Sequence, residues 1–325
     1  MDGAIVVSRL GGPEVLEWTR KDPGEPGPGE VLVRHTAVGL NFIDVYHRTG
    51  LYPLELPFTP GVEAAGVVER VGSGVEGHRA GDRVAYLLNG PLGSYCEARV
   101  LPSDRLFALP DDIDDETAAA IMLKGGTVEY LVRRTFPVKE DNWVLVHAAA
   151  GGVGLLLCQW LDALGANVIG TVGSAAKAEL VRSNGCDHPI EYRHEDVAAR
   201  VKQITDGRGV DVVYDSVGAD TFEGSLNSLR PRGMMVSYGN ASGPVEPVAP
   251  LLLAQKGSLF LTRPTIAHYY GSREESADGI AALFEVVSTG KVRPRVGARY
   301  PLARAAEAHR ALEARETVGS TVLTV

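Results

Sequence analysis

The sequence is poor in cysteine, and its few cysteines are far apart. Cys96, Cys158 and Cys186 are the only three among 325 residues. Their spacing matches neither a disulfide framework nor a metal-binding motif. Few cysteines without paired spacing are typical of a reducing compartment. We therefore expect a cytoplasmic protein.

Long apolar runs and an excess of basic residues are also missing. No apolar run approaches the roughly 20 residues that a membrane-spanning helix needs, and the N-terminus does not resemble a signal peptide. Acidic residues outnumber basic ones by 41 to 32, which gives a formal net charge of −9. Because nucleic acid is a polyanion, this charge argues against it as the main partner. We expect neither a membrane nor a nucleic acid as partner.

The first 110 residues contain short apolar runs separated by glycine and proline. This pattern is typical of β-strands joined by turns. We predict strands at 4–7, 31–38, 67–72, 82–86, 94–100 and 106–110. Several short strands with frequent turns favour a small barrel or sandwich.

After Pro110 the pattern changes to alternating strands and helices. A helical pattern at 114–131 is interrupted near Gly125–Thr127. We then predict strands at 144–147, 167–172, 188–190, 211–215, 233–238 and 259–261, and helices at 152–164, 175–184, 194–206 and 219–229. Alternating βα units predict an α/β domain with a doubly wound parallel sheet. The tail, 300–325, has a helix and a strand that we expect to return to the first domain.

The segment Trp143–Gly154 has the pattern of a dinucleotide-binding turn. An apolar strand leads into the small residues of 148–154, and a helical pattern follows. Small residues allow a tight turn and a close approach to a pyrophosphate, which the helix N-terminus attracts. Ala149 replaces the first glycine of the GxGxxG pattern. The alternative is a tight strand–helix turn in an ordinary α/β domain.

The end of the next strand bears on the choice of cofactor. NAD-preferring folds place an acidic residue there, which binds the ribose 2′-hydroxyl. Positions 172–174 carry no acid, whereas Ser174 and Lys177 offer a hydroxyl and a cation. These groups suit a 2′-phosphate, so the sequence favours NADPH over NADH. Taken alone, Lys177 is better explained as a solvated surface lysine, and it is the missing acid that favours the phosphate contact.

Together these motifs resemble the medium-chain dehydrogenase/reductases, specifically the zinc-free quinone oxidoreductases of the zeta-crystallin type. The resemblance covers nearly the whole chain. It rests on the motifs at 39–44, 60–66, 80–84, 148–154, 213–218 and 315–320. It implies a GroES-like partial β-barrel domain at 1–123 and 299–325, and a Rossmann domain at 124–298 with the doubly wound sheet. It further implies an active site in the cleft between the domains, and a homodimer in which strand 259–263 continues the sheet.

Zinc ligands can be compared directly within this superfamily. Its zinc alcohol dehydrogenases have a cysteine at the position of Asn41 and a histidine at that of Val62. A catalytic zinc needs three protein ligands, and their four-cysteine lobe is also missing, since only Cys96 lies in that region. We therefore predict no metal. Reduction of an electrophilic acceptor, a quinone or an α,β-unsaturated carbonyl, remains feasible.

The resemblance also implies which residues lie at the reacting centre. Residues matching Asn41 and Tyr46 lie by the nicotinamide, and those matching Tyr52 and Thr127 are near the acceptor pocket. An asparagine amide and a phenol can donate to a reduced oxygen. For both tyrosines the alternative is a partly buried loop residue. No strong general acid is evident, so we expect solvent to protonate the product, and we interpret His147 as a buried structural histidine.

Further positions are expected to contact NADPH. They are Ala150, Gly151, Gly152, Val153, Gly173, Ser174, Lys177, Tyr192, Ser216, Val217, Tyr238, Gly239, Asn240, Arg263 and Arg315. Glu191 stands where the family usually has asparagine, which counts against a phosphate beside Tyr192. Asn240 is equally compatible with a turn, and Arg315 with an arginine that interacts with a helix C-terminus.

The sequence therefore predicts an NADPH-dependent quinone oxidoreductase that acts without zinc on a small electrophilic acceptor. Within the same class, the alternative is an NADPH-dependent enone or 2-alkenal reductase. In a different class, the alternative is a low-turnover NADPH-binding protein with a structural or RNA-binding role. The net charge of −9 counts against the RNA-binding form.

Overall fold

The computed structural model describes residues 1–87 and 92–325, and the chain divides into two compact units. Unit 1 comprises 1–126, 270–288 and 294–325, and unit 2 comprises 127–269 and 289–293. The sequence analysis assigned all of 124–298 to the Rossmann domain. By contacts, the segment 270–288 groups instead with the β-rich unit.

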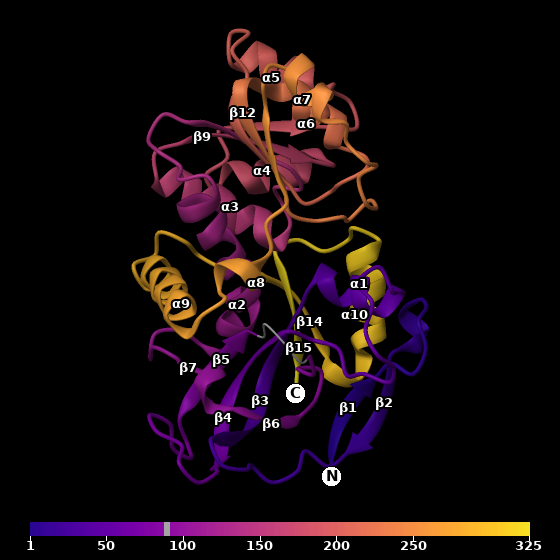
Figure 1. Ribbon diagram of the computed structural model, residues 1–325, viewed down its shortest axis with the longest axis vertical. Coiled ribbons are helices and arrows are strands. Elements are labelled where there is room, and N and C mark those ends of the chain that lie inside the picture. The colour runs from indigo at the N-terminus through magenta and orange to yellow at the C-terminus, as the bar shows by residue number, and fades with distance from the viewer. Residues whose placement is uncertain (88–91) are drawn as a thin grey trace. The chain divides into compact units, whose positions relative to one another are not determined.

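A mixed sheet forms the centre of unit 1. Its order, in the described part of the chain, is β14-β15-β3-β4-β5-β7, and β6 also pairs with β3. The strands are β3 (Glu30–Leu40), β4 (Glu63–Val71), β5 (Arg83–Leu87), β6 (Ala98–Pro102), β7 (Phe107–Ala108), β14 (Val296–Pro301) and β15 (Ser320–Thr324). A separate pair is formed by β1 (Asp2–Val6) and β2 (Glu17–Lys21). Figure 1 shows the yellow β15 near the indigo β3, and their antiparallel pairing confirms that the tail returns to the first domain.

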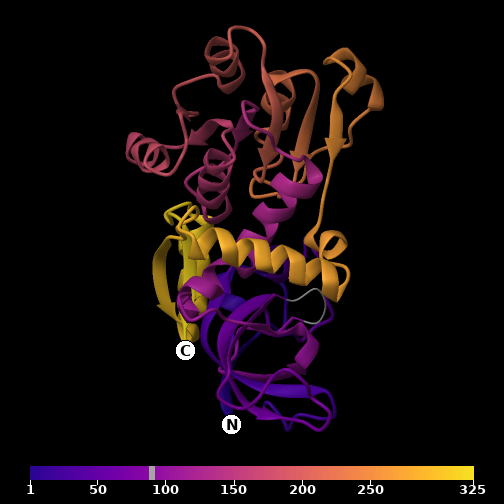
Figure 2. The same cartoon turned by 90° about the vertical axis from the view of Figure 1, so that its left-hand side faces the viewer.

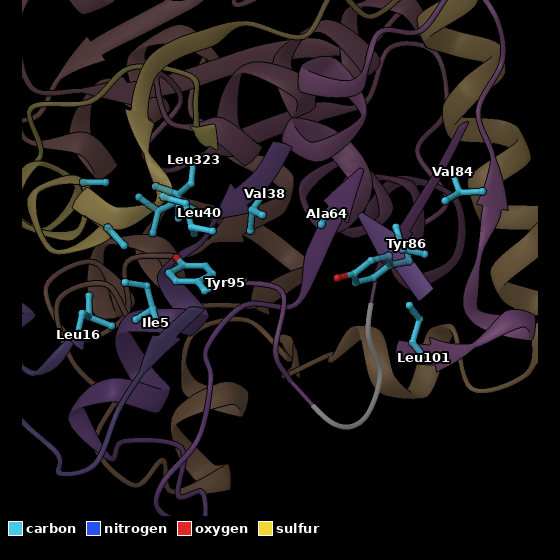
Figure 3. Packing of buried hydrophobic residues seen from close by; sticks show 14 of the residues in the cluster. Ile5, Leu16, Val38, Leu40, Ala64, Val84, Tyr86, Tyr95, Leu101 and Leu323 are labelled. Atoms are coloured by element: carbon cyan, nitrogen blue, oxygen red, sulfur yellow. The ribbon is translucent and has the colours of Figure 1, made fainter. Parts of the chain in front are cut away.

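The core of unit 1 joins residues that are distant in sequence. Leu323 of β15 is fully buried with Val38 and Leu40 of β3, and Figure 3 shows these side chains together. Burial of such side chains stabilises the fold by about 1.5–3 kcal/mol each. Two tyrosines share this core, and their hydroxyl groups find buried partners. Tyr86 pairs with His35, and Tyr95 donates to an aspartate described below.

The helices of unit 1 include two that the sequence analysis did not predict, α1 and α9. They are α1 (Phe42–Thr49), α2 (Asp115–Tyr130), α9 (Arg273–Ser288) and α10 (Ala305–Glu313), of which α2 continues into unit 2 from Thr127. The long orange helix of Figure 2 is α9.

The predicted interruption of the helix near Gly125 is wrong, because α2 is continuous through that position. A Cβ at Gly125 would lie 2.5 Å from Cδ1 of Leu283 on α9. The glycine therefore permits close helix packing and does not end the helix.

Unit 2 is a parallel sheet with the order β10-β9-β8-β11-β12-β13. Its strands are β8 (Trp143–Val146), β9 (Asn167–Val172), β10 (His188–Glu191), β11 (Val210–Asp215), β12 (Leu229–Ser237) and β13 (Phe260–Thr262). Its helices are α3 (Gly152–Ala163), α4 (Ala175–Arg182), α5 (Val197–Ile204), α6 (Phe222–Ser228), α7 (Pro250–Gln255) and α8 (Ile266–Tyr269), with a π-helical turn at Leu131–Thr135. The order confirms the predicted doubly wound sheet. Its direction of winding reverses between β8 and β11, where such folds bind ligands at the carboxyl ends of the strands.

Burial in unit 2 explains its near-continuous apolar strands. Val144, Leu145 and Val146 of β8 are fully buried, as parallel strands covered on both faces require. Across the described ranges, we find no helix with both the length and the apolar character needed to cross a bilayer.

Candidate functional site

The turn after β8 has the geometry that the sequence pattern predicts. Gly151 is the N-cap of α3, and its N–H donates to the Ala148 carbonyl at 2.9 Å. A Cβ at Gly154 would lie 2.3 Å from the same oxygen. Only glycine therefore lets α3 pack so closely against the turn.

The first turn of α3 is a potential anion-binding surface. Gly152 and Val153 open the helix, and backbone N–H groups in a first turn have no acceptor within their helix. The positive end of the helix dipole adds to the attraction for a negative group. The structure thus places the predicted pyrophosphate contacts, from Ala150 to Val153, at a helix N-terminus beside the point where the sheet reverses.

The ends of β9 and β10 bring four predicted cofactor residues together. Ser174 is the N-cap of α4, and its Oγ accepts from the backbone N–H of Lys177 at 3.4 Å. Tyr192 follows β10 and is 41% exposed. Its hydroxyl lies 2.9 Å from the Cβ that any residue other than glycine would have at Gly173. A hydroxyl, a lysine and a phenol therefore surround one exposed corner of the sheet.

Two loops after β11 and β12 also pack against each other. The N–H of Tyr238 donates to the Asp215 carbonyl at 2.8 Å, and the carbonyl of Ser216 accepts from Ala241. A Cβ at Gly239 would lie 2.5 Å from that Ser216 oxygen. The predicted residues Ser216, Val217, Tyr238, Gly239 and Asn240 thus form one continuous loop cluster at the carboxyl edge of the sheet.

The two predicted arginines lie in different units. Arg263 follows β13 in unit 2, and its guanidinium donates to the Pro264 carbonyl at 3.0 Å. Arg315 belongs to unit 1, two residues beyond the end of α10, with a left-handed φ of 60°. Arg315 therefore lies near a helix C-terminus, as its alternative interpretation requires, and its contact with cofactor stays a prediction.

Asn41 stands at the start of α1 in a buried polar network. Its side-chain amide donates to Oε1 of Glu63 at 2.7 Å, and its backbone N–H donates to Oδ2 of Asp44 at 2.9 Å. Glu63 is fully buried and also accepts from the N–H of Leu123 at 2.5 Å and from Nζ of Lys124 at 3.3 Å. The side-chain amide of Asn41 is therefore held in one orientation.

The sequence analysis missed Glu63 and Lys124 as partners of Asn41. Lys124 is 7% exposed and follows a run of buried alanine, isoleucine and methionine and the half-buried Leu123 on α2. A single lysine in such a run was the available signal, because a buried cation requires a paired anion.

The other three predicted catalytic residues lie on α1, after it and on α2. Tyr46 is on α1 and 8% exposed, and its ring centroid is 5.1 Å from that of the half-buried Tyr52. The backbone N–H of Tyr52 donates to the Tyr46 carbonyl at 3.1 Å. The structure thus brings Asn41, Tyr46 and Tyr52 onto one helix and the turn that follows. Thr127 lies on α2, where unit 2 begins.

Burial changes the acidity of side chains on α1. Complete burial raises the pKa of Asp44 to about 7, although hydrogen bonds from the Asn41 backbone and the Tyr95 hydroxyl oppose the shift. Burial also lowers the pKa of His47 to about 4. The hydroxyl of Tyr95 lies 3.0 Å from Asp44 and 3.1 Å from Nε2 of His309. Asn41 therefore contacts a buried cluster of polar side chains that comprises Asp44, Tyr95 and His309.

The donor set around Asn41 does not match a catalytic zinc site. Val62 is apolar and 3% exposed, and the thiol of Cys96 donates to the Gly93 carbonyl at 3.1 Å. Among residues 1–87 and 92–325, no three or more histidine, cysteine, aspartate or glutamate side chains form a group that could hold a metal.

Comparison with known proteins adds an independent line of evidence. Residues 27–111 match the alcohol dehydrogenase GroES-like domain, and residues 152–285 match the zinc-binding dehydrogenase family. A quinone oxidoreductase of Pseudomonas aeruginosa is 54% identical and a 2-haloacrylate reductase of Burkholderia is 46% identical, each over 98% of both chains. The crystal structure of Escherichia coli quinone oxidoreductase complexed with NADPH superposes with a TM-score of 0.97 at 48% identity, covering 99% of this chain and all of the other.

Proposed function

Because this chain belongs to the quinone oxidoreductases of the medium-chain dehydrogenase/reductase superfamily, we propose that it is an NADPH-dependent quinone oxidoreductase. The observation that carries the proposal is the carboxyl edge of the unit 2 sheet. There the N-terminus of α3 lies beside the reversal point of a Rossmann strand order. The similar Escherichia coli structure contains NADPH.

The residues of this edge fit a dinucleotide phosphate. Gly152 and Val153 would meet the pyrophosphate, because they open α3 and present backbone N–H groups. Ser174 and Lys177 would hold the 2′-phosphate, since the serine Oγ accepts from a backbone N–H and can still donate its own hydrogen. When bound, the cofactor supplies a hydride from its nicotinamide ring.

The residues around α1 would stabilise charge on the acceptor. One amide hydrogen of Asn41 goes to Glu63, which leaves the second to donate to the reduced oxygen. Tyr46 would donate its phenol hydrogen to the same kind of oxygen, while Tyr52 and Thr127 would contact the acceptor. Donors held in place before the reaction stabilise developing negative charge without reorganisation. In this proposal solvent supplies the product's proton.

We also propose that the reaction needs no zinc. Asn41 and Val62 replace the cysteine and histidine of the zinc enzymes in the superfamily, and the amide of Asn41 is already bonded to Glu63. Asn41 and Val62 therefore cannot supply the soft and imidazole ligands that zinc prefers.

Steady-state oxidation of NADPH tests the proposed function. The acceptors are 1,4-benzoquinone and 9,10-phenanthrenequinone, with NADH in parallel and with and without a metal chelator. We expect turnover that prefers NADPH and is unaffected by the chelator. Loss of activity with chelator would refute the proposed zinc independence, and a preference for NADH would refute the proposed roles of Ser174 and Lys177.

Replacement of Ser174 by aspartate should reverse the cofactor preference. Aspartate retains the N-cap, but its charge would repel a 2′-phosphate and bind a ribose hydroxyl. We expect kcat/KM for NADPH to fall by about tenfold or more, a loss of about 1.4 kcal/mol or more, with kcat/KM for NADH unchanged or higher. Ser183→Asp, on the exposed residue at the other end of α4, is the matched control. Equal losses in both variants would contradict the assignment.

A second candidate function is reduction of electron-poor alkenes. The 46% identical Burkholderia relative is a 2-haloacrylate reductase. The same donors on Asn41 and Tyr46 would then meet the oxygen of an enone or 2-alkenal. Rates on a panel of alkenals and 2-haloacrylate, compared with rates on the quinones, decide between the two. NADPH binding without turnover of either panel would leave the non-enzymatic alternative.

We further propose a cytoplasmic homodimer. The three cysteines are free thiols, as expected in a reducing compartment. Strand β13 ends the sheet order, and Phe260 on it is 57% exposed. An exposed apolar edge strand is a site for strand pairing. Light scattering should therefore give about twice the chain mass of 34.6 kDa, and Phe260→Glu should halve it. A wild-type mass of a single chain would contradict the dimer.

A further inference from the structure

A network of hydrogen-bonded, buried polar side chains lies beneath the carboxyl edge of the unit 2 sheet. It consists of Thr171 on β9, His147 after β8, Ser225 on α6 and Asp215 on β11. All four are at most 2% exposed. The contacts are 3.1 Å from Thr171 Oγ1 to His147 Nδ1, 3.0 Å from His147 Nε2 to Ser225 Oγ, and 2.8 Å from Ser225 Oγ to Asp215 Oδ2.

The donors and acceptors of this network determine the direction of each hydrogen bond between its side chains. The partners of Asp215 are all donors, namely the N–H groups of Val217 and Gly218 and the hydroxyls of Thr221 and Ser225. Since the single hydrogen of Ser225 goes to this carboxylate, the serine oxygen must accept from His147 Nε2–H. The other ring nitrogen of a neutral imidazole is then an acceptor, so Thr171 donates to it.

The neutral form of His147 agrees with its surroundings. Burial lowers the pKa of this histidine, and the nearby Asp215 opposes the shift. The hydroxyl oxygen of Thr171 also accepts from the N–H of Ala148 at 3.3 Å. The hydroxyls of Thr171 and Ser225 therefore each donate once and accept once.

At each end, the network binds the backbone of a loop that contains predicted cofactor contacts. At one end it holds Ala148, which adopts a left-handed φ of 52° directly before the fingerprint turn. A residue with Cβ is strained in that region and needs support from its surroundings. At the other end Asp215 binds the N–H groups of Val217 and Gly218 at 2.8 and 3.1 Å. The two loops flank the point where the sheet order reverses.

We propose that Thr171, His147, Ser225 and Asp215 are positioning residues that fix the β8 and β11 loops relative to each other for NADPH. The proposal rests on the proposed function. Loops held in the bound geometry lose less entropy on binding, so their preorganisation raises affinity. His147 thereby acts through other residues and touches neither acceptor nor cofactor.

Three variants test the proposal, with one matched control. Ser225→Ala removes the hydroxyl at the centre of the network. Thr171→Val removes the hydroxyl at one end, and Thr171→Ser retains it. The control is Ser228→Ala, because Ser228 is equally buried on the same helix but its hydroxyl donates to the Gly224 carbonyl of that helix at 2.8 Å.

We expect Ser225→Ala and Thr171→Val each to raise the Kd for NADPH, measured by calorimetry, by about tenfold. The KM for NADPH should rise in parallel, while kcat and the KM for quinone stay within about twofold of wild type. Thr171→Ser and Ser228→Ala should bind as wild type does. Because both changes break one network, the double variant should lose less affinity than the product of the single losses.

The outcomes separate this proposal from the proposed function. If wild type binds NADPH, and Ser225→Ala and Thr171→Val bind it as tightly as Ser228→Ala does, the positioning role is refuted and the proposed function stands. If wild type does not bind NADPH, both are refuted. Should Ser225→Ala fail to fold, Thr171→Val against Thr171→Ser gives the same decision.

Discussion

Replacement of Glu63 by alanine should destabilise unit 1 by about 3–5 kcal/mol, the usual cost of leaving one charge of a buried ion pair without its partner. Glu63 is fully buried and Lys124 is 7% exposed, so water cannot replace the lost carboxylate. The N–H of Leu123 and the amide of Asn41 would lose their acceptor as well. Urea-induced unfolding of wild type and variant measures the difference.

Removing both charges provides the control for this prediction. In Glu63→Gln/Lys124→Met the buried cation is gone and one side-chain acceptor remains near Asn41. We expect this double variant to lose clearly less stability than Glu63→Ala, because no unpaired charge is left in the interior. A Glu63→Ala variant as stable as wild type would show that the network around Asn41 contributes little to folding.

Acid should destabilise unit 1 through histidines that are buried in their neutral form. Burial lowers the pKa of His35 and His47 to about 4 and that of His309 to about 3. The unfolded chain has histidine pKa values of about 6.5. Between these values the unfolded state binds protons that the native state does not. Their stabilisation is therefore complete above about pH 6.5 and is lost as the pH falls toward 4.

Asp44 acts in the opposite direction. Burial raises its pKa to about 7, compared with about 3.9 in an unfolded chain. The native state then binds the extra proton, so the stability contribution of Asp44 increases as the pH falls from 7 toward 4. Three histidines against one aspartate leave a net loss of stability on acidification, which we expect to reach several kcal/mol at pH 4.5.

His35 provides the sharpest test of this pH dependence. Its Nδ1 contacts the Cys96 carbonyl at 2.7 Å and its Nε2 contacts the Tyr86 hydroxyl at 2.8 Å, so the neutral ring is fully satisfied. His35→Asn should lower stability at pH 7.5 and flatten the decline between pH 6.5 and 4.5. The control is His194→Asn at an exposed position. An unchanged slope in His35→Asn would refute the contribution of His35.

The sequence by itself determined most of the strands and helices and the location of the dinucleotide edge. An apolar run, a turn of small residues and a helical period are local features, and β8, the turn at 147–151 and α3 are contiguous in the chain. The absence of an acid after β9 is also a local fact. The residues expected there, from Gly173 to Tyr192, indeed lie at one corner of the sheet.

Only the tertiary structure decided which distant side chains become partners. Glu63 and Lys124 are 61 residues apart, and His147 and Ser225 are 78 apart. Lys124 stands out in its apolar run, but a pattern of neighbours contains no information about which residue on another element is the partner. Helix α9 shows the same limit, since its packing against Gly125 and Phe107 assigns it to unit 1. Chain folding creates these buried contacts, and desolvation makes the pairing of polar groups obligatory there.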